Sequence, residues 1–490
     1  MDKNYLLLLP ILIPIISGLF VSKRTPVDKT FRLAGIVVIV NFVILIGVIF
    51  LNQGALDILS LSDMLKFHLQ IDELSILFTI LAGFIWILVS FYSFEYMRIE
   101  EDVDEFYRFF LISYGLVIGI GFSGNMFSFY LFYELMTLMT LPLVTHARNE
   151  EAIRAGITYL VYSFGGAALV LVAIIYTYFN GVTFDFVPGG MMIPEVFRTR
   201  PALIVYVLGF LGFGSKAGMF PLHAWLPLAH PVAPAPASGI LSGIVTKAGV
   251  LGIIRLTFFV FGADFIRGTW AQILLMSLIL FTIFMGSMLA FGTEIMKERL
   301  AYSSVSQVSY VLFGIILLNT EGLIGGLTHM TFHALIKNIL FLGAGAMICQ
   351  RNIHLTTRLR GLGKEMPIVM WTFTIASLAL IGIPPLGGFL SKWYLGMGGL
   401  NFWNFDFGLL GLITIIISAL LTGGYLIPIF VDAFFPGADY EYNKIITCEP
   451  SKNMTISLII LTAVVVIIGL YPVWLIDFFK VIASSLLGGA

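Results

Sequence analysis

The chain has 490 residues, of which 59% are hydrophobic and only 11% are charged. Soluble proteins contain about 25% charged residues, so this composition indicates a polytopic membrane protein. The net charge of -1 provides no basic surface for nucleic acid, and the sequence has neither a dinucleotide-binding nor an ATP-binding glycine motif. Because the only two cysteines, Cys349 and Cys448, form no Cys-x-x-Cys pair, we expect no metal or redox cofactor in this chain.

Apolar segments of about 20 residues, the length that crosses a bilayer, follow one another along the chain. The first has no small-residue cleavage site, so it is interpreted as a span and not as a signal peptide. Lys and Arg are more frequent in the loops opposite the termini, which predicts a multi-pass protein of the inner (cell) membrane with both termini on the outer side. The predicted fold is all-α, with fourteen transmembrane helices at 5–22, 31–52, 73–93, 106–122, 124–145, 153–180, 201–226, 238–260, 269–291, 301–319, 322–349, 367–397, 407–432 and 453–476.

Helix-breaking residues lie deep in two of these segments. They are Pro221 and Pro227 at the end of the seventh segment, and Pro384, Pro385, Gly387 and Gly388 in the twelfth. Proline removes a backbone donor and clashes with the preceding turn, so each segment should be interrupted. Such breaks persist in a membrane where protein or water satisfies the free backbone groups. Lys216 and Lys392 lie close to the two breaks, which favours ion sites over simple packing kinks.

The paired breaks also suggest an internal duplication, in which helices 4–8 and 9–13 are five-helix repeats of opposite topology. Inverted repeats with discontinuous helices are typical of transporters. The predicted units are 1–105 for the first three helices, 106–260 for the first repeat, 261–432 for the second repeat, and 433–490 for a loop and the last helix.

Six ionisable residues lie inside otherwise apolar segments. A charge at the bilayer centre costs about 2.5–3.5 kcal/mol, so a series of them predicts a route for ions. A dehydrated lysine can lose its proton and an arginine cannot, so the arginine is interpreted as a fixed charge or as an anchor that reaches the membrane surface. Anchoring is also an alternative for the last lysine, and a structural ion pair is an alternative for the glutamate. The six residues are Glu134, Lys216, Lys247, Arg255, Lys337 and Lys392.

His329, His333 and Lys337 follow one another at intervals of four residues, so they share one face of a helix. With Thr328 and Thr331 beside them, they could organise water into a proton wire. A zinc site at His-x-x-x-His is an alternative, although no third ligand is evident and the lysine would repel a cation. Histidines that only satisfy the core are a further alternative.

The remaining histidines lie outside the predicted spans or at their ends. His223 and His230 are predicted to flank a loop at the mouth of an entry path, with a solvated loop as the alternative. His68, His146 and His354 are interpreted as surface residues.

Five motifs point to one family when taken together. They are Gly-Ser-Lys-Ala-Gly-Met-Phe-Pro-Leu-His-Ala-Trp-Leu-Pro (214–227), Ala-Pro-Ala-Pro-Ala-Ser-Gly-Ile-Leu (233–241), Leu-Ala-Tyr-Ser-Ser-Val-Ser-Gln (300–307), His-Ala-Leu-Ile-Lys-Asn (333–338) and Pro-Pro-Leu-Gly-Gly-Phe-Leu-Ser-Lys (384–392). The chain from about residue 70 to 430 resembles the antiporter-like, proton-conducting subunits of respiratory complex I, Mrp-type sodium/proton antiporters and group 4 membrane-bound hydrogenases.

This resemblance implies a polar axis along the membrane midplane. Glu134 is expected to pair with Lys216, and Lys247 is expected to bridge to His329, His333 and Lys337, with Lys392 at the end of the axis. Ser242 stands where one relative has histidine, and no long lateral helix is expected after Ile476. The implied partners are other membrane subunits in the lipid bilayer, including homologous antiporter-like subunits, and a peripheral redox arm.

Three functional hypotheses follow from the sequence. The leading one is a non-redox pumping subunit of an NADH:quinone oxidoreductase-like or hydrogenase-like complex, which moves H+ with or without exchange for Na+. The second is a subunit of a gradient-driven Mrp-type cation/proton antiporter. The third is a solute carrier, which requires a substrate cavity in place of a narrow wet axis.

Overall fold

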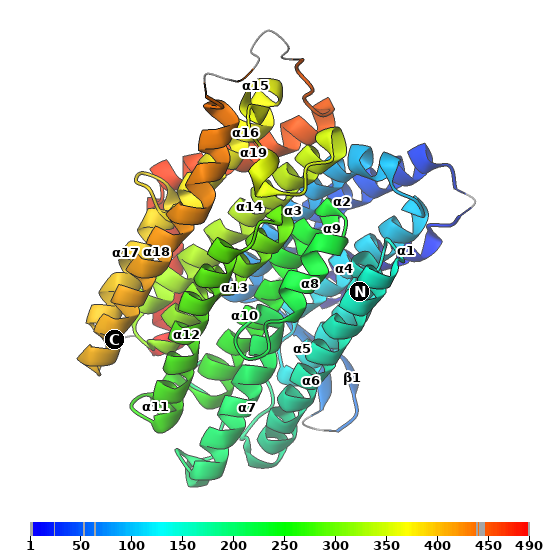
Figure 1. Cartoon of the computed structure of the whole chain (residues 1–490). Helices are drawn as coiled ribbons and strands as arrows, with labels where there is room; N and C mark the ends of the chain where they lie inside the picture. Colours follow the sequence, from blue (N-terminus) through cyan, green and yellow to red (C-terminus); the bar gives the residue numbers. More distant parts are fainter. Residues whose placement is uncertain are drawn as a thin grey trace.

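The structure is a computed structural model that describes residues 3–23, 25–51, 54–62, 65–437, 440 and 446–488. The helices form one bundle with a small β-hairpin at one end and the short helix α15 (Leu362–Glu365) at the other (Figure 1). In the hairpin, β1 (Ala55–Ser60) pairs antiparallel with β2 (Lys66–Gln70). Ten helices in the described ranges are long and apolar enough to cross a membrane. The predicted all-α membrane fold is therefore confirmed.

The remaining helices follow one another along the chain in three groups. The first group comprises η1 (Lys3–Leu8), α1 (Leu9–Phe20), α2 (Val27–Leu51), α3 (Glu73–Tyr96), η2 (Met97–Ile99), α4 (Val103–Phe122), α5 (Met126–Val144) and α6 (Glu150–Asn180). The middle group comprises η3 (Pro194–Val196), α7 (Arg200–Ala217), α8 (Trp225–Val232), α9 (Ala235–Ile240), η4 (Leu241–Val245), α10 (Thr246–Ile254), η5 (Arg255–Phe261), α11 (Ala263–Ile266) and α12 (Trp270–Gly292). The last group comprises α13 (Met296–Ile316), α14 (Thr320–Arg351), η6 (Thr356–Arg358), α16 (Pro367–Ile381), α17 (Gly387–Leu400), α18 (Phe405–Phe434), α19 (Lys452–Leu470) and α20 (Val473–Leu487).

Several helices begin at an Asp or Asn side chain that accepts a hydrogen bond from a free backbone amide of the first turn. Asp72 accepts from Ser75 at the start of α3, and Asn125 accepts from Ser128 at the start of α5. The β-hairpin, which the sequence reasoning did not predict, lies against this second cap, because Asn125 also donates to the carbonyl of Lys66 at 2.9 Å. These caps fix where each span enters the bundle.

The first predicted break lies between α7 and α8, at residues 218–224. Gly218 ends α7 with a positive φ of 83°, and a Cβ there would meet Leu226 at 2.1 Å. The Trp225 indole donates to the carbonyl of Ser215 at 2.8 Å, and this carbonyl also accepts a hydrogen bond from the backbone amide of Gly218 at 3.2 Å. Pro227 was predicted to interrupt a helix, but it does not. It occupies the first turn of α8, where backbone amides have no helical acceptor. His230 consequently lies inside α8 and not in a loop.

The second predicted break, between α16 and α17, contains Pro384 and Pro385. α16 ends at Gly382, which has a positive φ of 95°. The carbonyls of Leu380 and Ile381 lose their helical donors there and accept hydrogen bonds from Lys392 at 2.8 and 2.6 Å. A side chain thus satisfies the backbone at the break, as a membrane interior requires.

A third discontinuity divides the predicted last helix at Pro472, between α19 and α20. The sequence reasoning treated 453–476 as one helix, although proline at 472 removes a donor and ends α19. The break lies beside the second one, because a Cβ on Gly469 would come within 2.9 Å of the backbone nitrogen of Gly387. After this break, α20 continues to Leu487, whereas the last predicted helix ends at residue 476.

The eighth predicted span is helical throughout but contains two π-helical stretches, η4 and η5, on either side of α10. π-Helical turns are rare and often occur at functional sites. Nothing in the sequence pattern predicted them. The start of the chain and its C-terminal helix both approach the hairpin end of the bundle, since Asn4 lies against Gly54 and Leu487 lies near Asn319. The division into repeats remains a prediction.

Candidate functional site

Lys216, the penultimate residue of α7, is fully buried and surrounded by hydroxyl groups. Its amine donates to Thr137 at 2.7 Å, to Ser163 at 2.9 Å and to Tyr159 at 3.1 Å. The nitrogen also lies 4.6 Å from the ring centroid of Tyr159, where the aromatic face attracts a cation. The pocket can therefore hold the amine in its charged form without a carboxylate in direct contact.

Glu134 lies on α5 one helical turn before Thr137, so its carboxylate belongs to the same region as Lys216. Its Oε1 is buried and has no hydrogen-bond partner within the described part of the chain. Lys216 is the charged group that interacts electrostatically with this carboxylate. No ion pair within 4.0 Å joins the two side chains across the described ranges, so the pair implied by the resemblance is open in this structure.

Lys247 on α10 directly contacts the histidine row. Its amine lies 2.7 Å from Nδ1 of His333 and donates to the carbonyl of Ser242 at 2.5 Å. Ser242 belongs to the π-helical stretch η4, which places its carbonyl within reach of the lysine. An amine at this distance from an imidazole nitrogen can exchange a proton with it directly.

His329, His333 and Lys337 line one buried face of α14, as predicted. The two imidazole rings are stacked with centroids 6.0 Å apart. Nδ1 of His329 lies 2.9 Å from the hydroxyl of Ser391 on α17. At the other end of the face, the Lys337 amine donates to the carbonyl of Leu300 at 2.8 Å and to the hydroxyl of Ser303 on α13.

Lys392 follows Ser391 and ends the row at the α16–α17 break. Its amine is directed at the free carbonyls of Leu380 and Ile381 and lies 5.5 Å from the ring centroid of Tyr310. That ring is also 5.1 Å from the ring of His329. The lysine is therefore held inside the protein and does not extend to the membrane surface, which was the alternative interpretation.

The Lys216 and Lys247 regions meet where α10 packs against α7. Gly249 makes this close approach possible, because a Cβ there would lie 2.7 Å from the carbonyl oxygen of Phe213 and 3.1 Å from the Cβ of Lys216. The predicted residues thus form a sequence of neighbouring groups that runs through α5, α7, α10, α14 and α17. The hydroxyl groups of Thr137, Tyr159 and Ser163 were not predicted as site residues, because isolated Ser, Thr and Tyr are common in membrane helices.

The two histidines provide no evident metal centre. No group of three His, Cys, Asp or Glu side chains in the described ranges could hold a metal ion. The neighbours of His333 and His329 are an amine and a hydroxyl, and an amine cation repels a metal ion.

Of the two interpretations of Arg255, a fixed charge or a surface anchor, the structure agrees with the fixed charge. It is 1% exposed and forms an ion pair with Asp72, the residue that caps α3. Its guanidinium also lies 4.5 Å from the ring centroid of Phe259 and 4.8 Å from that of Phe186. The partner itself was not predicted, because it is 183 residues away in the sequence.

Replacing Arg255 with leucine is expected to destabilise the protein by about 3–5 kcal/mol, because the change leaves the Asp72 carboxylate without its buried partner. Thermal unfolding in detergent measures the effect. The double variant Arg255→Leu with Asp72→Asn should recover part of the loss, since it removes the unpaired charge. Equal instability of the single and double variants would contradict this account.

Asp72 also predicts a pH dependence. Burial alone would raise its pKa, but the charge and hydrogen bonds of Arg255 hold the pKa of this carboxyl below its usual value. A depressed pKa contributes stability that is complete above the unfolded-state value and is lost as the pH falls toward the folded value. The melting temperature of the wild type should therefore decrease as the pH drops below about 4. The Asp72→Asn variant should lack the part of this decrease that comes from Asp72.

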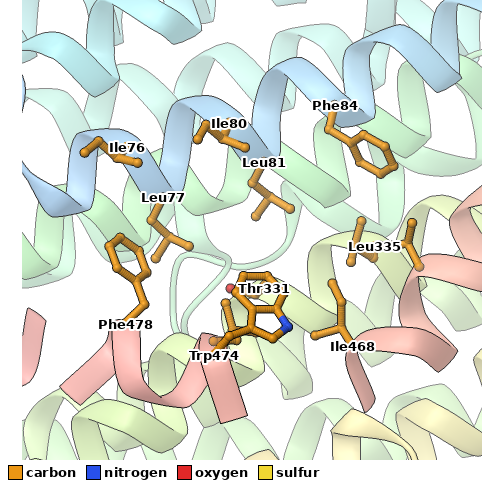
Figure 2. Close-up of a pocket in the computed structure, with 12 residues that line it drawn as sticks. Ile76, Leu77, Ile80, Leu81, Phe84, Thr331, Leu335, Ile468, Trp474 and Phe478 are labelled. Carbon is orange, nitrogen blue, oxygen red and sulfur yellow. The ribbon is translucent and has the colours of Figure 1, made fainter. Parts of the chain in front are cut away.

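One apolar groove lies apart from the ionisable row. Figure 2 shows this groove between α3, α14 and the α19–α20 break, with a volume of about 270 Å³. Thr331 carries the only hydroxyl among the lining side chains, and it donates to the carbonyl of Leu327 at 3.0 Å. A polar solute would find no charged group there, so this groove does not support the solute-carrier hypothesis.

Comparisons with known proteins agree with this geometry. Residues 123–421 match the family model described as "NADH:quinone oxidoreductase/Mrp antiporter, TM", and residues 60–110 match "NADH-Ubiquinone oxidoreductase (complex I), chain 5 N-terminus". Hydrogenase-4 component B of Escherichia coli is 31% identical over 438 residues, which cover 83% of this chain and 63% of that protein. This chain therefore spans less than two thirds of that relative's length.

Two further similarities cover nearly the whole chain. A Na(+)/H(+) antiporter subunit of Bacillus subtilis is 28% identical over 449 residues, which cover 90% of this chain and 89% of the relative. A chain in the solved structure of the Mrp complex from Dietzia sp. superposes with a TM-score of 0.84 at 18% identity, covering 99% of this chain and 98% of that one. The structural match concerns the fold.

Proposed function

This chain belongs to the transmembrane family of NADH:quinone oxidoreductase and Mrp antiporter subunits, and we propose that it conducts protons along the row from Glu134 to Lys392. It is an antiporter-like membrane protein. The observation that supports proton conduction most directly is the contact between Lys247 and His333, because it joins two buried protonatable groups on different helices.

The proposed transfer starts at Lys216. In the open state its amine is held by three hydroxyl groups, and closure of the Glu134–Lys216 pair would draw the positive charge toward α5. The electrostatic repulsion on Lys247 would then decrease, and Lys247 would take up a proton. When the pair opens again, Lys247 would pass its proton to His333 and on toward His329, Ser391 and Lys392.

Buried polar atoms without a protein partner support a wet path. The Nε2 atoms of His329 and His333 and the Oε1 of Glu134 have no hydrogen-bond partner in the described ranges. Buried polar groups in proteins are nearly always paired with protein or with water, so these atoms mark positions where water would bridge the side chains.

We propose that the energy comes from a redox-driven partner. This chain offers no evident seat for a redox centre, so a peripheral arm would supply electron transfer, and homologous antiporter-like subunits would lie beside it in the membrane. Moving one charge against 100 mV requires about 2.3 kcal/mol. We further propose an inner-membrane location with both termini on the outer side, as the distribution of Lys and Arg in the loops suggests.

Reconstitution of the complete complex in proteoliposomes tests the proposal. A pH-sensitive dye inside the vesicles should report proton movement when electron donor and acceptor are added, and an uncoupler should abolish the signal. Electron transfer without any proton movement would contradict the proposed function. Transport of radioactive Na+ under the same conditions would distinguish exchange of the two ions from proton movement alone.

A gradient-driven Mrp-type antiporter subunit is the second candidate. The Bacillus subtilis antiporter subunit matches along 89% of its own length, whereas the Escherichia coli hydrogenase component matches along 63%. Identification of the subunits that purify with this chain separates the candidates. Subunits with iron–sulfur clusters favour the redox-driven complex, and small membrane subunits alone favour the antiporter.

A further inference from the structure

Two buried basic side chains lie outside the row described above. Lys297, the second residue of α13, is 6% exposed, and its amine donates to the carbonyl of Ala233 at 2.8 Å. His230 on α8 is fully buried, and neither of its ring nitrogens has a hydrogen-bond partner among the described residues. The burial of Lys297 was not predicted, because this lysine stands in a charged stretch at the start of a helix.

His230 lies next to the row. Its ring is stacked on Phe341 with centroids 4.5 Å apart, and the Lys337 amine lies 5.9 Å from the centroid of the same phenylalanine ring. The charged groups that interact electrostatically with the His230 imidazole are Lys337, Lys297 and Lys247. The imidazole and the Lys337 amine therefore lie near the same aromatic ring, that of Phe341.

Helix α13 aligns Lys297 with Lys337. Leu300, which accepts the hydrogen bond from Lys337, follows Lys297 by three residues on the same face of the helix. Three residues correspond to a rise of about 4.5 Å, less than one helical turn. The Lys337 amine thus contacts α13 within one turn of the residue that carries the Lys297 amine, and Lys297 is nearer the start of that helix.

This end of the bundle is exposed to water. The start of α13 is joined to the loop after α14, because the backbone nitrogen of Met296 donates to the carbonyl of His354, an exposed residue. Glu100, which follows η2, is half-buried, and its carboxylate interacts electrostatically with the Lys297 amine. The Lys297 amine therefore lies near this exposed end, and its acceptor Ala233 follows His230 by three residues along the chain.

A structural role explains only part of this arrangement. A positively charged amine stabilises the C-terminus of a helix when it donates to a terminal backbone carbonyl. Lys297 donates to the carbonyl of Ala233 at the end of α8, so capping that helix would explain this lysine alone. The stacking on Phe341 does not satisfy the two ring nitrogens of His230, and a buried polar group without a partner has an energetic cost. Water molecules between the two side chains would satisfy both the ring and the amine.

We propose that Lys297 and His230 form a proton relay between Lys337 and the aqueous phase at the bundle end where α13 begins. The relay rests on the proposed function, because it supplies protons to the same row. A proton from water or Glu100 binds the neutral Lys297 amine, passes through water to one nitrogen of His230, and leaves from the other nitrogen toward Lys337. The transfer leaves the imidazole as its other tautomer, and rotation of the ring or a second proton transfer through water between its nitrogens restores the initial state.

Substitutions in the complete complex, reconstituted in proteoliposomes, test the relay. Lys297→Met and His230→Phe should each lower proton translocation at least about tenfold, since each removes one exchangeable group. His230→Phe retains the stacking on Phe341. Lys364→Met, at an exposed lysine of α15, is the matched control and should translocate at the wild-type rate.

Lys297→Arg distinguishes a relay from a cap. Arginine preserves the charge and can donate to Ala233, but it does not release its proton in proteins. The relay predicts that Lys297→Arg is assembled normally, as native gel electrophoresis would show, and is as inactive as Lys297→Met. Wild-type translocation by Lys297→Arg would overturn the relay. If Lys247→Met is inactive while Lys297→Met is fully active, the relay is wrong, but proton conduction along the row is still supported. A wild-type complex that moves no protons would overturn both the relay and the proposed function.

Discussion

Replacing Lys216 with methionine is expected to lower proton translocation by about 10²-fold or more, the usual contribution of a positioned acid or base, while the complex still assembles. Methionine fills a similar volume but has no exchangeable proton. Thr137, Ser163 and Tyr159 lose their partner, yet Tyr159 keeps its 2.7 Å hydrogen bond with Thr140. Dye-reported proton movement in proteoliposomes measures the rate, and native gel electrophoresis measures assembly.

Two further variants make this test specific. Lys216→Arg keeps a positive charge that cannot be released, so it should be as inactive as the methionine variant. Tyr159→Phe removes one of the three hydroxyl partners and keeps the aromatic ring, so a decrease of about tenfold or less is expected from the loss of one hydrogen bond. Wild-type translocation by Lys216→Met would show that the row does not include α7.

Replacing His333 with phenylalanine is expected to interrupt the row with an effect of similar size. The change keeps an aromatic ring beside His329 but removes the nitrogen that contacts the Lys247 amine at 2.7 Å. Lys247→Met should have the same effect from the other side of the contact. The rate of proton translocation, normalised to assembled complex, measures both.

The double variant of Lys247 and His333 provides the decisive comparison. Residues that act as one unit have non-additive effects, so the double variant should be no slower than the slower single variant. Multiplied losses in the double variant would indicate two independent routes. His354→Phe, at an exposed histidine outside the row, is the matched control and should leave translocation unchanged.

The composition of the site was predictable, but several of its contacts were not. Charged residues are rare in membrane helices, so Glu134, Lys216 and Lys247 could be identified from their positions alone. The partner of Arg255 could not, because no local pattern connects it to Asp72. The same applies to the hydroxyl groups around Lys216, which resemble ordinary polar residues of a membrane helix.

The helix breaks show the same distinction. Proline and glycine predicted the α16–α17 break correctly, since both residues act on the local backbone. Pro227 misled the prediction because its effect depends on where the helix starts, and Gly218 ends α7 first. As a result, His230 was assigned to a loop, although the structure buries it beside Phe341.

The discontinuity at Pro472 gives the end of the chain a mechanical connection to the row. α19 ends against Gly387, at the break whose carbonyls hold Lys392, and the end of α20 lies in a small cavity wall together with Asp72 and Phe186. Protein interiors are close-packed and transmit displacement. The last two helices therefore form a continuous packed connection from the break that holds Lys392 to the start of α3, along which a shift of α17 would be transmitted.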